Sequence, residues 1–292
     1  MRTFALCQRS ISVAILLIAS GAAARAQSDV PPQPQPMSSG SVSDSPTAES
    51  SPAITDSKSP LRLEFNTWIW LTAIEGTIGT RGRTADVDAS FSDILDASDS
   101  ILAFSGRIEL WYGRFGGYFD ALYQDLGVDD VSGPRGQADV DVEFTQTIID
   151  FGLMYRVGDW EASGEAAKNS RNLTLDLYAG GRYTDVEVEL IPRNVNSRST
   201  EEEWLDPVVG AKLVVPLAER WHLAINGDIG GFGVESDLAW SATGVVGYNF
   251  HVFDVPSSVL LGYRAIGWDY SDGDFTWDLV QHGLLLGFSM RF

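Results

Sequence analysis

The chain contains a single cysteine, Cys7, and only three histidines among its 292 residues. Cys7 lies ahead of the apolar stretch 11–24, in an N-terminal segment that has a basic start and a small-x-small cleavage site ending at Ala26. These are the features of a secretory signal peptide. Removal of residues 1–26 would leave no cysteine, which excludes disulfides, thiolate metal sites and a cysteine nucleophile. The histidines show no paired spacing, so the sequence predicts no metal site and no cofactor.

Basic residues are also few, with 20 Lys and Arg against 40 Asp and Glu and a net charge of −20. An acidic surface of this size argues against nucleic acid as a partner and against docking on anionic lipid. After residue 26 there is no long uncharged apolar run, which excludes membrane-spanning helices from this part. Residues 27–60 are rich in Pro, Ser, Gln and Thr and are predicted to be a disordered linker. Residues 61–292 remain as one folded domain.

Within this domain apolar residues alternate with small or polar residues at a period of two, and turn signals separate the alternating segments. In segment 102–112, for example, apolar residues such as Phe104 fall on one face and polar residues such as Arg107 on the other. A strand that faces lipid on one side and a polar lumen on the other has this pattern. The sequence predicts an all-β fold, a transmembrane antiparallel β-barrel of about ten strands.

The start of the domain leaves the number of strands open. Trp68 to Leu71 is apolar on both faces, and residues 84–91 could form an additional strand. Ser92 to Asp96 has the pattern of a short helix with Ser92 as its N-cap. Barrels of eight or twelve strands therefore remain possible.

The last strand candidate, Val280 to Phe292, shows the alternation most clearly. Met290, Phe288 and Leu286 share one face with Phe292, while Arg291 and other small or polar residues occupy the opposite face. This ending resembles the terminal strand of small bacterial outer-membrane β-barrel proteins, which close on an aromatic residue. The resemblance implies a location in the outer membrane and recognition by the outer-membrane assembly machinery, with Phe292, Met290 and Phe288 as the assembly signal.

Aromatic residues gather near the ends of the predicted strands, as in the two aromatic girdles of a membrane barrel. One group lies beside short turns, at Tyr112, Phe115, Tyr155, Trp221, Phe250 and Phe292, and the other toward the opposite ends, at Tyr183, Trp204, Trp240 and Trp268. The short links are predicted on the periplasmic side. The acidic segments at 129–130, 201–203 and 272–274 are then predicted to be outer loops, forming a solvated rim or bridging divalent cations to lipopolysaccharide.

The polar faces of the strands carry a balanced set of charges in an otherwise acidic chain. Six are acidic and six basic: Glu109, Asp120, Asp150, Asp176, Asp206, Asp228, Arg107, Arg156, Arg182, Lys212, Arg264 and Arg291. Because a buried charge needs a partner, this balance favours a paired network that fills the lumen, with Tyr118, Tyr178 and Trp268 adding volume. A narrow, selective channel lined by the same charges is the alternative.

No catalytic constellation is recognisable in the sequence. Of the three histidines only His222 falls on a lumen-facing register, and no serine accompanies it; His282 falls on the lipid-facing register. We therefore expect a non-enzymatic barrel in contact with outer-membrane lipid and lipopolysaccharide, serving envelope integrity or surface interaction. A narrow pore for small solutes is the second possibility and a lipid-modifying enzyme the third. The sequence leaves the ligand and the oligomeric state open.

Overall fold

The computed structural model describes residues 61–80, 83–97, 100–132, 139–169, 171–192 and 198–292. The predicted signal peptide and linker, residues 1–60, lie outside the described residues and stay predictions. None of the helices in the described ranges has the length and apolar character needed to cross a membrane.

The described chain consists almost entirely of β-strands. In order, the elements are β1 (Leu61–Thr80), β2 (Arg83–Ala89), the helix α2 (Phe91–Ala97), β3 (Ser100–Tyr112), β4 (Phe115–Ser132), β5 (Asp139–Trp160), the 3₁₀ helix η1 (Gly164–Lys168), β6 (Leu173–Pro192), β7 (Arg198–Pro216), β8 (Trp221–Gly231), β9 (Ser236–Val252), β10 (Val255–Asp272) and β11 (Phe275–Arg291).

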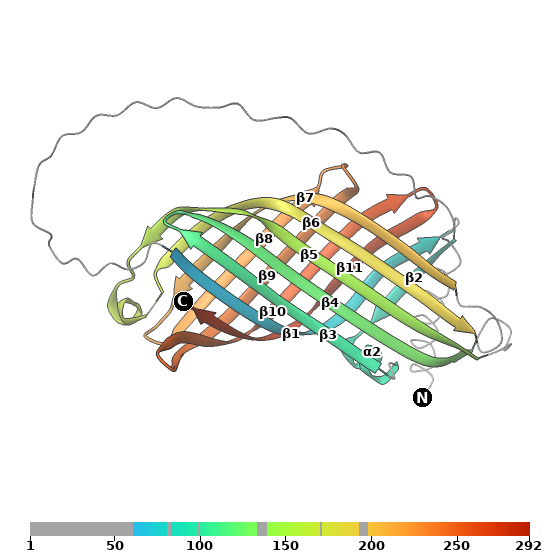
Figure 1. The fold of residues 1–292 in the computed structure, drawn as a ribbon, viewed down its shortest axis with the longest axis horizontal. Coiled ribbons are helices and arrows are strands. Elements are labelled where there is room, and N and C mark those ends of the chain that lie inside the picture. Colours follow the sequence, from blue (N-terminus) through green and yellow to red (C-terminus); the bar gives the residue numbers. More distant parts are fainter. Residues whose placement is uncertain (1–60, 81–82, 98–99, 133–138, 170, 193–197) are drawn as a thin grey trace, which may run out of the picture.

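One antiparallel sheet closes on itself to form a barrel of ten strands, β1 and β3 to β11 (Figure 1). Each strand from β3 onward pairs with its neighbour in sequence, and β11 returns to pair with β1 from Glu64↔Arg291 to Gly79↔Thr276. The other edge of β1 is shared, because β3 pairs with its first half and β2 with its second. The predicted number of about ten strands is confirmed. Closure pairs both edges of most strands, although residues 198–207 of β7 extend past β8 and pair only with β6.

The two ends of the barrel differ in their connections. At one end, here called the turn end, β1 begins and β11 finishes, and three links are short: Gly113–Arg114, 217–220 and Phe253–Asp254. The fourth link at this end, residues 161–172, carries η1. The opposite end, here called the loop end, carries β2, α2 and the connections that follow β4, β6, β8 and β10. Figure 1 places the C-terminus and the start of β1 together, away from α2.

The outer surface of the barrel is an apolar belt that gives way to acid near the loop end. On β5 the outward residues Ile149, Phe151, Leu153, Tyr155 and Val157 form part of the belt, and Leu153 is 76% exposed. Closer to the loop end, outward carboxylates lie directly opposite each other across β5, β6 and β7: Glu143↔Glu189, Glu187↔Glu201 and Asp185↔Glu203. Carboxylates in this density belong in water rather than hydrocarbon, so these strands extend beyond the membrane.

The extension of these strands corrects the prediction of acidic outer loops. Asp129–Asp130 lies within β4 and Glu201–Glu203 within β7, whereas only the Gly273–Asp274 link is a turn. Sequence alternation continues past the hydrocarbon boundary because strand pairing does, and this hides the point where the membrane ends.

The region around α2 also differs in detail from its prediction. The predicted strand at 84–91 exists as β2, which extends the β1 edge and adds no eleventh member to the closed ring. The cap of α2 is Ser90 rather than Ser92. The Ser90 Oγ accepts from the Asp93 backbone N–H at 3.3 Å, and the Asp93 carboxylate accepts from the Ser90 backbone N–H at 3.0 Å. This reciprocal pair of hydrogen bonds places the N-cap two residues earlier than predicted.

Phe292 takes part in the pairing between β11 and β1 that closes the barrel. Phe292 is 61% exposed on the outer face, its backbone N–H donates to the Leu63 carbonyl at 2.8 Å, and the Leu63 N–H donates to the Phe292 carbonyl at 3.0 Å. The role of Phe292, Met290 and Phe288 as an assembly signal stays a prediction.

We expect Phe292→Asp to lower the amount of assembled barrel in the outer-membrane fraction sharply. This change keeps both backbone hydrogen bonds to Leu63 and replaces the aromatic ring with a charged carboxylate. Heat-modifiable migration on a gel reports the folded barrel. The matched control, Phe292→Tyr, should assemble at the wild-type level, and a normal folded band for Phe292→Asp would contradict the assembly role.

Candidate functional site

The predicted lumen charges point into the interior of the barrel, which is built in layers. The inward residues of β5 cross these layers from the turn end to the loop end in the order Arg156, Met154, Gly152, Asp150, Ile148, Gln146 and Phe144. On β5, charges therefore occupy the middle and the turn end, and apolar side chains predominate in the loop half.

An apolar core of aromatic residues fills the loop half of the lumen. Trp204 stacks on Tyr270 with ring centroids 4.3 Å apart, and Trp277 lies between Trp204 and Phe275 at centroid distances of 6.4 and 6.2 Å. Trp204, Trp268 and Trp277 are at most 3% exposed. Such a core excludes water from this half of the barrel.

This core corrects the prediction of the outer girdle. Trp204 and Trp268 lie inside the lumen, whereas Tyr183 and Trp240, also predicted for that girdle, lie on the outward register. Trp240 and Trp268 do lie near strand ends, four residues from the end of β9 and β10 respectively, whereas Tyr183 lies in the middle of β6. An aromatic residue near a strand end fills a closed lumen as readily as it anchors a membrane interface, and only its parity along the strand separates the two roles.

The middle of the lumen holds a continuous chain of ion pairs. Eight charges from seven strands alternate in sign, in the order Lys212, Glu109, Arg107, Asp120, Arg264, Asp150, Arg182 and Asp228. The shortest links are Lys212 to Glu109 at 2.6 Å, Arg182 to Asp150 at 2.7 Å and Arg107 to Glu109 at 2.8 Å. Arg182 is 1% exposed and also contacts Asp228 at 3.0 Å. We call these eight residues the central network.

Tyrosines and glycines fix the central network in place. The Tyr178 hydroxyl donates to Asp228 at 3.1 Å, and the Arg107 guanidinium lies 4.4 Å from the centre of the Tyr118 ring. Tyr178 packs closely over β7 at Gly210, where a Cβ would come within 2.4 Å of the tyrosine ring. The glycine thus allows a large side chain to lie along the barrel wall beside the buried charges.

Four of the twelve predicted lumen charges lie apart from the central network. Arg156 binds Asp176 in bidentate fashion at 2.7 and 3.0 Å near the turn end, with its guanidinium 4.5 Å from the Trp111 ring centre. Asp206 lies near the loop end and accepts from the backbone N–H and the hydroxyl of Ser236 at 2.9 and 2.7 Å. Arg291 lines a cavity at the turn end.

An ion pair that was not predicted from the sequence crosses the turn end. Arg171, in the link that follows η1, reaches Glu64 on β1, with both terminal guanidinium nitrogens 3.3 Å from Glu64 Oε1. In the same link, Asn169 donates to the carbonyls of Ala218 and Trp221 at 2.7 and 2.9 Å. The link therefore folds across the mouth of the barrel. The alternation along β1 could have shown that Glu64 points inward. Its partner could not have been predicted, because it lies 107 positions away in a segment outside the strands.

A glutamine cluster between the central network and the aromatic core was also missed. Gln124 and Gln281 both donate to the Gln146 side-chain carbonyl, Gln281 at 2.7 Å, and all three glutamines are buried. Their inward parity could have been recognised, because each falls on the polar face of its strand.

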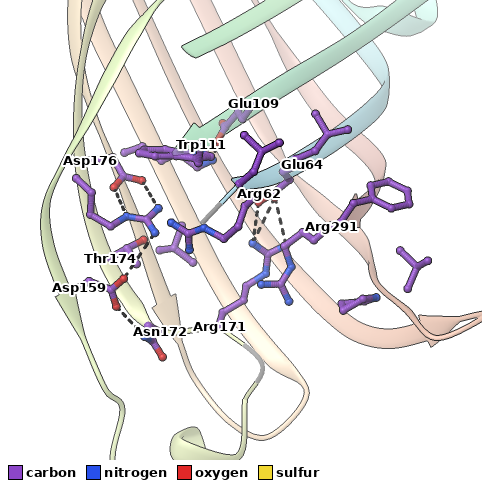
Figure 2. A pocket seen from close by; sticks show the side chains of 18 of the residues that line it. Arg62, Glu64, Glu109, Trp111, Asp159, Arg171, Asn172, Thr174, Asp176 and Arg291 are labelled. Carbon is purple, nitrogen blue, oxygen red and sulfur yellow. Dashed lines mark hydrogen bonds and ion pairs between the residues drawn. The ribbon is translucent and has the colours of Figure 1, made fainter. Parts of the chain in front are cut away.

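The space left in the lumen narrows toward the middle. A cavity of about 650 Å³ opens at the turn end, and Figure 2 shows the side chains that line it. Cavities of about 60 and 40 Å³ lie against the central network. The smaller volumes suit one or a few water molecules. Among the described residues no cluster of His, Cys, Asp and Glu suitable for a metal ion is found.

The described histidine contacts are with groups other than serine. His222 is 1% exposed in the lumen, and its ring fills the space above Gly247. His282 lies on the outward face, 2.6 Å from the Tyr263 hydroxyl and 3.3 Å from Glu75.

The chain matches no protein-family model, and no curated protein matches it. Among solved structures it is similar to Ail, the attachment invasion locus protein of Yersinia pestis, at 10% identity and a TM-score of 0.37, over 80% of this chain and 98% of that chain. It is also similar to the translocator domain of the autotransporter NalP from Neisseria meningitidis, at 13% identity and a TM-score of 0.37, over 81% of this chain and 90% of that chain.

Likeness at these TM-scores carries no argument, so the fold assignment rests on the molecule itself. The β11–β1 pairing closes the sheet, the outer face is an apolar belt, and the inner face is charged in the middle. Together these features identify a closed, transmembrane antiparallel β-barrel, the fold predicted from the sequence.

Proposed function

We propose that this protein is a non-enzymatic, integral outer-membrane β-barrel whose lumen is closed to bulk solute and whose loop end is presented at the cell surface. In this proposal the turn end faces the periplasm, because turns of bacterial barrels are short on that side. Outer-membrane lipid and lipopolysaccharide contact the apolar belt, and the assembly machinery recognises the terminal strand.

The central network together with the aromatic core is the observation that carries this proposal. A solute crossing the barrel would first have to separate buried ion pairs such as Arg182–Asp150, which are 1% and 9% exposed. It would then have to pass the stacked rings of Trp204 and Tyr270, whose apolar faces do not replace its hydration shell. Both layers span the lumen, so a pore would require the displacement of side chains from opposite walls.

A narrow pore for small solutes is the second candidate. Its support is the succession of cavities, about 650, 60 and 40 Å³, that leads from the turn end toward the central network. Uptake of small sugars into proteoliposomes that contain the wild-type barrel would favour this candidate.

A lipid-modifying enzyme has the least support. Outer-membrane acyl hydrolysis needs a serine activated by a histidine and donors for the oxyanion. The contacts of His282 are with Tyr263 and Glu75, and His222 is enclosed in the lumen. Neither arrangement supplies a serine nucleophile next to a base.

The proposed location and orientation are tested by labelling single-cysteine variants in intact cells with a membrane-impermeant maleimide. Val234→Cys in the β8–β9 turn should be labelled, and Leu217→Cys in the β7–β8 turn should be labelled only after lysis. Both side chains are more than half exposed, at 63% and 51%, so they are matched in access. The unsubstituted chain measures background from Cys7. If only Leu217→Cys is labelled in intact cells, the orientation is the opposite of the one proposed.

A further inference from the structure

The wall of the barrel has an open edge on β7 near the loop end. Residues 198–207 pair with β6 on one side, but on the other side the pairing of β7 with β8 reaches only as far as Val208↔Gly230. β8 ends there because residues 231–233 all take positive φ angles and turn the chain back toward β9. A strand that continues past its neighbour leaves backbone N–H and C=O groups available to another strand. We call residues 198–205 the open edge.

Alternate residues of this stretch turn their backbone polar groups away from β6. Pro207 shows the direction, because a Cβ on Gly230 of β8 would lie 2.5 Å from the Pro207 carbonyl oxygen, which therefore faces β8. In an antiparallel strand the N–H and C=O of one residue point to the same side, and residues two apart share that side. Leu205, Glu203 and Glu201 therefore present their backbone groups to the open side.

Side-chain contacts hold the open edge in a fixed position. Where it meets the β8–β9 turn, Asp206 accepts hydrogen bonds from the backbone N–H and the hydroxyl of Ser236 at 2.9 and 2.7 Å. Inside the lumen, Trp204 stacks on Tyr270 of β10 with ring centroids 4.3 Å apart. A partner strand would thus meet an edge that is already ordered, which lowers the entropic cost of binding.

The outer face of the open edge is acidic. Glu201 and Glu203 point outward there, opposite Glu187 and Asp185 on β6. Glu203 accepts from the Tyr183 hydroxyl at 2.6 Å, and in the described part of the chain none of these four carboxylates is paired with a basic side chain. Burial raises the pKa of the Asp185 carboxyl, and the Glu201 and Glu203 carboxylates raise it further. A strand added beside β7 would place its outward side chains directly opposite Glu201 and Glu203.

We propose that the open edge binds an extended segment of another protein by β-strand addition, and that this segment carries lysine or arginine at alternate positions. Backbone hydrogen bonds to Glu201, Glu203 and Leu205 would supply the pairing, and the basic side chains would neutralise the acidic face. The open edge can hold a full strand, since strands are commonly about five to six residues long. A second copy of this chain is a poorer occupant, because both copies carry the same acidic residues at this edge.

The test uses the full chain, folded in a non-ionic detergent, and a fluorescent peptide of alternating lysine and threonine or valine, Thr-Lys-Val-Lys-Thr-Lys-Val-Lys. Fluorescence anisotropy should show saturable binding of one equivalent, about tenfold or more tighter than for the same peptide with glutamate in place of lysine.

Substitutions at Glu201 separate the backbone edge from its charge. Glu201→Pro removes a backbone donor as well as the carboxylate and should weaken binding about tenfold or more, whereas Glu201→Gln removes only the charge and should weaken it less. Proline is compatible with this side of β7, since Pro207 lies three alternate positions further along, and heat-modifiable migration verifies folding. The matched control is Glu143→Gln, an exposed carboxylate on β5, two strands from the open edge, which should bind the peptide as the wild type does.

N-methylated peptides distinguish strand addition from attraction between charges alone. Methyl groups on the lysine nitrogens, or on the threonine and valine nitrogens, each block one edge of the peptide, so one set should abolish binding and the other should leave it. Equal binding of the two methylated peptides, no saturable binding of the parent peptide, or binding unchanged in Glu201→Pro would overturn the proposal. A wild-type dimer that Glu201→Pro dissociates would also overturn it and assign the edge to a second copy. Only the location of the partner outside the cell depends on the proposed orientation, which the maleimide labelling tests separately.

Discussion

Arg182→Ala should be among the most destabilising single substitutions in the barrel. Arg182 is 1% exposed and joins Asp150 and Asp228 at 2.7 and 3.0 Å, so its loss leaves two buried carboxylates without their strongest partner. Removal of one member of a buried ion pair costs about 3–5 kcal/mol, and less where water enters. Urea-dependent folding into lipid vesicles, followed by tryptophan fluorescence, measures this free energy.

The matched control for Arg182→Ala is Lys168→Ala. Lys168 also forms an ion pair, with Glu165 at 2.9 Å, but the two side chains are 57% and 73% exposed. An exposed pair contributes about 0–1 kcal/mol, so this variant should fold as the wild type does. If both variants lose the same free energy of folding, the central network is as hydrated as the surface pair, and the proposal of a closed lumen is wrong.

Leu153→Arg should reduce the free energy of folding into lipid by about 2–4 kcal/mol, the cost of an arginine on the lipid face near the middle of the bilayer. Leu153 is the central residue of the five outward apolar residues of β5 and is 76% exposed. Its side chain must therefore meet hydrocarbon if the belt is the membrane-spanning surface. The same folding assay in vesicles provides the measurement.

Glu187→Arg places the same new side chain on the same outer face, but within the acidic extension near the loop end. There Glu187 lies directly opposite Glu201, and like charges in that position are unfavourable. We expect this variant to be as stable as the wild type or slightly more stable. Equal losses for Leu153→Arg and Glu187→Arg would contradict the boundary drawn between the belt and the extension.

Parity along the strands was the part of this fold that the sequence could predict. Alternation placed Arg107 and Asp150 inside and Phe119 and Leu153 outside, because each strand has a period of two and the two faces meet different solvents. The terminal strand was predicted in the same way, with Leu284 outside and Leu285 inside.

Depth along the barrel and contacts across the lumen could not be predicted. A position near a strand end does not by itself show whether an aromatic residue such as Trp204 fills the lumen or lies at the membrane interface. The Glu64–Arg171 pair depends on where the link after η1 folds, and no periodic signal marks that path. The extension of β5 to β7 beyond the membrane was hidden because hydrogen-bonded pairing continues across the boundary.

The most direct test of the account is the ionic conductance of the wild-type barrel in planar lipid bilayers. We predict no steady conductance, because the central network and the aromatic core span the lumen. Arg182→Ala should show brief, irregular openings, since it removes the link between Asp150 and Asp228. A stable, high wild-type conductance that Arg182→Ala leaves unchanged would contradict the closed lumen and favour the pore.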